Sequence, residues 1–197
     1  HYNVVYAHMT RGKTGKTVAY ALGGLAGTLN KLASDACLFM SQNFGFIELP
    51  KEFTTGSSIM PHKKNPDVFE LMRGKCNKLQ AIVGELTMIT SNLTSGYFRD
   101  LQLLKEKYMY GFEEIISCLE VALLVIPNIS VKNNILEDDL YDYLFSVEEV
   151  NRRVLEGTPF REAYKQVGIE IEEGKFSPNK EVNHTHEGTV GNLAEVK

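Results

Sequence analysis

Apolar residues recur at helical spacing along most of the chain. Between about residues 17 and 41 they alternate at spacings of four and three, which predicts an amphipathic helix. The positions expected to be buried are Val18, Leu22, Leu25, Leu29, Leu32 and Ala36. Gly23, Gly24 and Gly27 lie inside this helix. Because glycine is unfavourable there, we expect them to mark close contact with another helix.

Two further long helices are predicted. Asn65 as N-cap, Pro66 at the first helical position and Asp67 in the first turn begin the second helix. Its expected buried positions are Val68, Leu71, Met72, Leu79, Ile82, Val83 and Leu86. The third helix follows a Ser-, Thr- and Gly-containing break and stops at Pro127. Its expected buried positions are Leu101, Leu104, Tyr108, Phe112, Ile115, Leu119, Leu123 and Ile126.

After Pro127 the pattern predicts shorter helices. Gly157 ends one of them, and Thr158 and Pro159 begin another as N-cap and first position. The last 25 or so residues are polar and without periodicity, and no segment alternates as a strand would. The chain is therefore predicted to be all-α. Residues 1–128 would form part of a long-helix bundle domain, and residues 129–197 a small helical C-terminal domain.

Composition excludes several classes of protein. The 197 residues carry a net charge of −4, with a pI near 5.8, which argues against binding to nucleic acid or an anionic membrane. The sequence has no apolar run long enough for a membrane span and does not start like a signal peptide, so we expect a cytoplasmic protein. It also lacks an initiator Met, which indicates that it begins partway through a larger protein. Cys37, Cys76 and Cys118 are expected to be reduced core residues.

Two segments imitate binding motifs. Residues 10–17, "TRGKTGKT", end like a phosphate-binding loop, but Thr10 stands where the first glycine belongs, and no parallel-sheet pattern accompanies them. A solvated basic loop is the better interpretation. His184, His186 and Glu187 could ligate a metal, but their polar segment offers no rigid scaffold, so surface residues are expected and no metal site.

Candidate chemistry gathers in two places. The first is the loop before the second helix, with Ser57, Ser58, Lys63, Lys64 and Asn65. A serine can act as nucleophile or base, and the lysines can stabilise a carboxylate or the dianion formed beside one, whereas Asn65 could bind a ligand or merely cap the helix. Glu70 could be a solvated first-turn acid. The second place is the start of the third helix, with Tyr97, Arg99, Asp100, Gln102 and Lys105, which could equally be an exposed helix end.

The segment "GSSIMPHKKNP" resembles the G-S-S-x-M-P-x-K-x-N-P signature of the fumarase/aspartase superfamily. Within it, "KKNPDVFELMRGK", "YFRDLQLLKE" and "GTPFREAYKQVG" are similar, in order, to segments of the argininosuccinate lyase family. The resemblance implies an all-helical protomer, four of which assemble around a shared helical core with each active site formed by three chains. It also implies β-elimination of argininosuccinate to L-arginine and fumarate, in arginine biosynthesis, without metal or organic cofactor.

The resemblance assigns roles to individual residues. Ser57 would be the general base, Lys63 would stabilise the aci-carboxylate, and Glu70 would pair with the family's catalytic histidine. The remaining matches would bind substrate: Asn65, Tyr97, Gln102 and Lys105. The family's histidine-bearing segments would precede this chain, so the chain alone is expected to be inactive.

Several positions depart from the family pattern. His62 stands where Gln is usual and is typical of adenylosuccinate lyases; Phe98, Leu103 and Leu104 also differ. The segment "TRGKTGK" does not match the usual S-D-R-D-F, so the resemblance assigns no role to Arg11. The alternatives are an adenylosuccinate lyase and a catalytically inactive, crystallin-like homologue.

Overall fold

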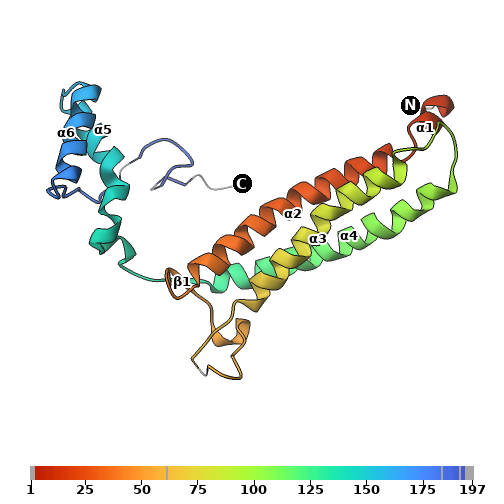
Figure 1. Cartoon of the computed structure of the whole chain (residues 1–197), viewed down its shortest axis with the longest axis horizontal. Helices are drawn as coiled ribbons and strands as arrows, with labels where there is room; N and C mark the ends of the chain where they lie inside the picture. Colours follow the sequence, from red (N-terminus) through yellow and green to blue (C-terminus); the bar gives the residue numbers. More distant parts are fainter. Residues whose placement is uncertain (1–2, 61, 183, 191, 194–197) are drawn as a thin grey trace. The chain divides into compact units, whose positions relative to one another are not determined.

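The structure is a computed structural model that describes residues 3–60, 62–182, 184–190 and 192–193. It divides into two compact units, residues 1–132 and 133–197. Helices make up most of both units, and strands are few, which confirms the predicted all-α class (Figure 1). The assignment of residues 1–128 and 129–197 to two domains stays a prediction.

The first unit is a bundle of three long helices: α2 (Lys13–Phe39), α3 (Asp67–Thr90) and α4 (Leu103–Val125). They lie side by side in Figure 1. A short helix, α1 (Val4–Met9), precedes them, and three 3-10 segments flank them: η1 (Lys51–Phe53), η2 (Arg99–Gln102) and η3 (Ile126–Asn128). The two-residue strands β1 (Ile47–Glu48) and β2 (Ser130–Val131) pair antiparallel, which ties the segment after α2 to the segment after α4.

The basic segment 10–17 is mostly helical, so its prediction as a loop was wrong. Gly12 takes the positive φ of 82° at the N-cap, and α2 begins at the next residue. A Cβ on Gly12 would lie 3.1 Å from Thr90 and 3.2 Å from Leu101. The start of α2 therefore packs closely against residues far along the chain.

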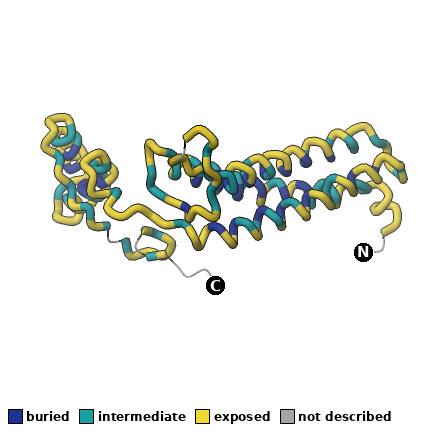
Figure 2. The backbone as a smooth tube through the Cα atoms, turned by 90° about the horizontal axis from the view of Figure 1, so that it is seen from below, coloured by how far each residue is buried: buried dark blue, intermediate teal, exposed yellow. Residues whose placement is uncertain are grey.

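The core lies between the inner faces of the three helices (Figure 2). Most of the predicted positions are buried or half-buried, but Leu25, Leu71, Phe112, Leu123 and Ile126 are exposed, and Leu123 is 76% exposed. On α4 the buried positions are Leu104 and Ile115, as predicted, together with Gly111, Cys118, Ala122 and Val125. Small residues fill part of the inner face because the helices approach closely there. A Cβ on Gly111 would lie 3.1 Å from Leu22.

The glycines of α2 confirm the predicted close contact in part. A Cβ on Gly23 would lie 2.9 Å from Val83 of α3, whereas Gly24 faces open space. Two predicted core cysteines, Cys76 and Cys118, are buried on the facing helices α3 and α4. Burial raises the pKa of the Cys76 thiol to about 12, so this thiol is protonated near neutral pH.

The second unit contains η4 (Ile135–Glu137), η5 (Asp139–Phe145), α5 (Ser146–Leu155) and α6 (Phe160–Glu172). Val150, Ala163 and Val167 form its small core. Gly157 follows the end of α5 with a φ of 104°, as predicted, whereas the N-cap of α6 is Pro159 rather than Thr158.

A buried carboxylate joins the helices of the second unit. Glu149 accepts hydrogen bonds from Arg152 at 2.8 and 2.6 Å and from Arg153 at 2.9 Å. Arg153 also donates to Glu170 of α6 at 2.7 Å. The hydrogen bonds from Arg152, with those from Arg153, lower the pKa of Glu149 to about 2, so this group is ionised at neutral pH despite its burial.

Among the described residues, none of the helices has the length and apolar character needed to cross a membrane.

Candidate functional site

The loop between η1 and α3 is closed at its base by backbone pairing. Thr55 N–H donates to Asn65 O at 3.3 Å, and Asn65 N–H donates to Thr55 O at 2.8 Å. The Thr55 hydroxyl donates to the Asp67 carboxylate, and the Asn65 side-chain amide donates to Gly56 O at 3.4 Å. Asn65 therefore holds the base of the loop together and does not cap α3. The N-cap of α3 is Pro66, so the predicted cap was wrong by one residue.

Ser57 and Ser58 have different surroundings in this loop. Ser57 is half-buried, and its Oγ accepts hydrogen bonds from Ile59 N–H at 3.2 Å and Met60 N–H at 3.1 Å. Ser58 is exposed. Two donors directed at one hydroxyl oxygen would stabilise negative charge on it more than they stabilise the neutral group. Sequence alone could not separate these serines, because the difference arises from the turn that follows them.

The predicted cationic and acidic side chains follow the two serines closely in the sequence, and they are exposed. Lys63 and Lys64 are exposed, and Lys63 N–H donates to Met60 O at 3.0 Å within the same turn. Glu70 is exposed in the first turn of α3, where a negative charge is favourable. Pro61, which belongs to the signature, lies outside the described residues.

The second candidate group lies around η2 and the start of α4. Lys105 Nζ donates to Gln102 Oε1 at 2.8 Å, so these two predicted substrate-binding residues are in contact. The Arg11 guanidinium lies over the ring of Tyr97, 3.9 Å from its centroid. Sequence reasoning left Arg11 without a role, and nothing in the sequence indicates this contact between residues so far apart along the chain.

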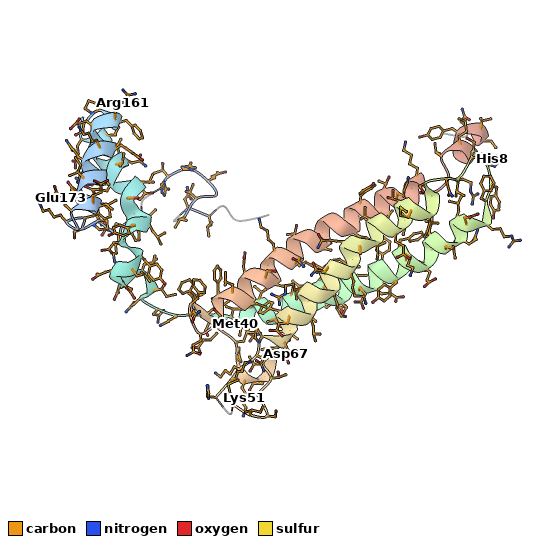
Figure 3. The ribbon with its side chains drawn as sticks, viewed as in Figure 1. His8, Met40, Lys51, Asp67, Arg161 and Glu173 are labelled. Carbon is orange, nitrogen blue, oxygen red and sulfur yellow. The ribbon has the colours of Figure 1, made fainter. Side chains whose placement is uncertain are left out.

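The two groups lie at opposite ends of the bundle. The serine loop precedes α3 and the Tyr97 segment follows it, so the 24 residues of α3 separate them by about 36 Å. In Figure 3, Lys51 and Asp67 are labelled near the first group, and His8 marks the other end of the bundle. A single chain therefore cannot bring both groups to one small ligand.

Residues 13–81 match a family model described as a lyase. The chain is 64% identical over 192 residues to an argininosuccinate lyase of Parabacteroides distasonis, which covers 98% of this chain. The chain is similar to an argininosuccinate lyase along nearly all of its length. A second argininosuccinate lyase, from Bacteroides fragilis, is 61% identical over the same length. The chain spans 43% of the length of both relatives.

A solved structure supports the fold of this chain. A fumarate lyase:delta crystallin from Brucella melitensis matches with a TM-score of 0.63 and 22% identity, covering 89% of this chain and 39% of that structure. The predicted fumarase/aspartase-type fold and the resemblance to argininosuccinate lyases are thereby confirmed. The roles of the individual site residues stay predictions. Within the described ranges, the chain has no group of three or more His, Cys, Asp or Glu side chains arranged to hold a metal ion.

Proposed function

We propose that the chain is part of an argininosuccinate lyase that cleaves argininosuccinate to L-arginine and fumarate by β-elimination, in the cytoplasm. The 64% identity to an argininosuccinate lyase across 98% of the chain carries this proposal. Because the chain spans 43% of that relative, the activity is proposed for the whole protein to which this chain belongs. The geometry of the two residue groups suggests how this chain takes part in it.

Ser57 is the proposed base. Its oxygen takes a proton from the succinyl carbon next to a carboxylate, and the electron pair left behind moves into that carboxylate to form the aci-carboxylate. The N–H groups of Ile59 and Met60, at 3.2 and 3.1 Å from Ser57 Oγ, would stabilise the ionised hydroxyl before the transfer. The bond between carbon and the guanidino nitrogen then breaks, which gives fumarate, while the nitrogen keeps its electron pair and is protonated to complete L-arginine.

Lys63 is proposed to stabilise the dianion that forms in the first step. A proton on a carbon beside a carboxylate is held tightly, so the site must supply positive charge as the proton leaves. Lys63 is exposed on the same loop as Ser57, and movement of that loop toward the substrate would deliver both groups together. Asn65, at the closed base of the loop, is proposed to bind the substrate carboxylate region. Glu70, beyond it on α3, is proposed to pair with a histidine of another segment.

Tyr97, Gln102 and Lys105 are proposed to bind the ends of the substrate in a different site from the one that this chain's Ser57 serves. The length of α3 supports this arrangement, because about 36 Å separates the two groups. Each complete site would then combine the serine loop of one chain with the Tyr97 segment of another.

Apolar side chains on the outer face of α4 support a homotetramer with shared sites. Leu103, Met109, Ile116 and Leu123 are between 51% and 76% exposed in the single chain. Exposed apolar side chains along one long helix favour burial against further helices.

The test is release of fumarate by the whole protein, followed by its ultraviolet absorbance with argininosuccinate and, separately, with adenylosuccinate. Release from argininosuccinate alone is the expected result. Release from adenylosuccinate alone would favour the alternative suggested by His62, and no release from either would favour a crystallin-like protein.

A further inference from the structure

Ser57 and Lys63 lie equally far along the chain from the paired residues that close the serine loop. These residues, Thr55 and Asn65, form the loop base through two backbone hydrogen bonds of 3.3 and 2.8 Å. Ser57 follows Thr55 by two residues, and Lys63 precedes Asn65 by two. Two residues of extended chain span about 7 Å, so each Cα stays within about that distance of the loop base however the tip moves. The position of the loop base therefore limits where both groups can lie.

A side-chain hydrogen bond attaches the loop base to α3. The Thr55 hydroxyl donates to the carboxylate of Asp67, the first residue of α3, which is labelled in Figure 3. A charged acceptor makes such a hydrogen bond stronger than one between neutral groups. The ion pairs among the described residues do not include Asp67, so no cation in that part of the chain competes with Thr55 for the carboxylate.

The first turn of α3 is a firm support for this attachment. Phe69, in that turn, is 0% exposed and belongs to the core of the bundle. Glu70, which is proposed to pair with a histidine, follows Asp67 by three residues, so the two are neighbours on the helix surface. Fixing the loop base to Asp67 therefore also limits how far Ser57 and Lys63 can lie from Glu70.

We propose that Thr55 and Asp67 are positioning residues for the elimination, an inference that rests on the proposed function. Their hydrogen bond fixes the loop base on α3, so that Ser57 and Lys63 reach the substrate in a defined geometry while the tip of the loop moves. A displacement of about 1 Å in a reacting group can lower a rate 100-fold. Loss of the hydrogen bond should therefore lower kcat more than it weakens binding, because the Tyr97 segment that is proposed to bind the substrate's ends is unchanged.

The test is steady-state fumarate release from argininosuccinate by the whole protein carrying Thr55→Val, which keeps the shape of the side chain and removes the donor. We expect kcat to fall about tenfold or more and KM to change less than about threefold. Thr55→Ser keeps the hydroxyl and should retain most of kcat. Asp67→Ala should act like Thr55→Val, and the double variant should lose no more than either alone, because all three remove the same contact.

Thr54→Val is the matched control. The Thr54 hydroxyl donates to Lys51 O at 3.2 Å, in the turn before the loop rather than on α3, so kcat should change less than about twofold. Hydrogen exchange of the Thr55 and Asn65 amides gives a second readout that needs no activity, and it should be faster in Thr55→Val than in Thr54→Val.

The positioning proposal is wrong if Thr55→Val and Thr54→Val have the same kcat, or if the two amides exchange equally in both variants. Either result leaves the proposed elimination standing as long as the unchanged whole protein releases fumarate. A whole protein that releases none even without these substitutions would contradict the elimination, and with it the role in positioning. The exchange of the two amides would still show whether the hydrogen bond fixes the loop base.

Discussion

Ser57 and Ser58 are adjacent hydroxyls with different surroundings, and this difference is the basis of a residue-scale prediction. Two backbone N–H groups point at Ser57 Oγ, whereas Ser58 is exposed. In the whole protein, Ser57→Ala should lower kcat for argininosuccinate by roughly 100-fold or more, because it removes the proposed base. Substrate binding should be largely kept, since Tyr97, Gln102 and Lys105 are unchanged. Steady-state rates of fumarate release at a series of argininosuccinate concentrations measure both kcat and substrate binding.

Ser58→Ala is the matched control for this substitution. It removes the same atom from the next residue and should reduce kcat only mildly. The assignment of the base would be wrong if Ser58→Ala were inactive and Ser57→Ala nearly normal, even with the family unchanged.

Glu149 allows a second prediction at the residue scale, in which the sign of the pH dependence is set by its pKa. Glu149→Gln removes the charge that Arg152 and Arg153 share, and it should lower the opening free energy of α5 and α6 by roughly 2 kcal/mol or more. The pKa of this carboxyl falls from 4.5 to about 2 in the fold, so its contribution is fully present above about pH 4.5 and is lost as the pH falls towards 2. Hydrogen exchange of α5 and α6 amides across that range measures the difference.

Glu156→Gln tests whether the burial of Glu149 is what makes Glu149→Gln costly. Glu156 pairs with Arg152 at 2.5 Å but is 59% exposed, so its loss should cost less than about 1 kcal/mol. Equal effects of the two substitutions would contradict the interpretation that the buried carboxylate holds the two helices together.

At the scale of elements, the serine loop is predicted to be mobile without substrate. From Ser57 to Lys64 none of the described residues is buried, and the loop is held mainly at its base by the pairing of Thr55 with Asn65. Backbone amides between these two residues should exchange within seconds, whereas those in the middle of α3 should be protected. Hydrogen exchange of the unliganded protein measures this, and protection of the loop comparable with that of α3 would contradict it.

The elements also illustrate which local signals are dependable. Pro66, Gly157 and Pro127 lie within a residue or two of the helix ends that they predicted, because they act through their own backbone geometry. The exposed Leu71 and Leu123 were predicted to be buried, because apolar spacing marks positions that suit burial but does not say which helix covers them. Small residues such as Gly111 and Ala122 carry almost no apolar signal, although close packing buries them.

At the scale of the whole molecule, shared sites make a complementation prediction. Ser57→Ala and Gln102→Ala damage opposite ends of the bundle. When whole proteins carrying each change are unfolded together and refolded, mixed oligomers should regain partial activity, because some sites combine an intact loop with an intact Gln102 segment. The fumarate assay measures the recovery.

Ser57→Ala mixed with Lys63→Ala is the control, since both changes lie on the same loop and every mixed site would keep one defect. Recovery equal in the two mixtures, or absent from both, would contradict sites built from the opposite ends of two chains.

The sequence by itself determined the helical class, the approximate extent of the long helices and the grouping of Ser57, Lys63 and Asn65 in one loop. Each of these depends on residues that are neighbours along the chain, through periodicity, capping and short loops. Only the tertiary structure decided that the serine loop and the Tyr97 segment lie at opposite ends of the bundle, and that Arg11 stacks on Tyr97. Those relations depend on how distant segments pack against one another, and packing leaves no periodic mark in a single sequence.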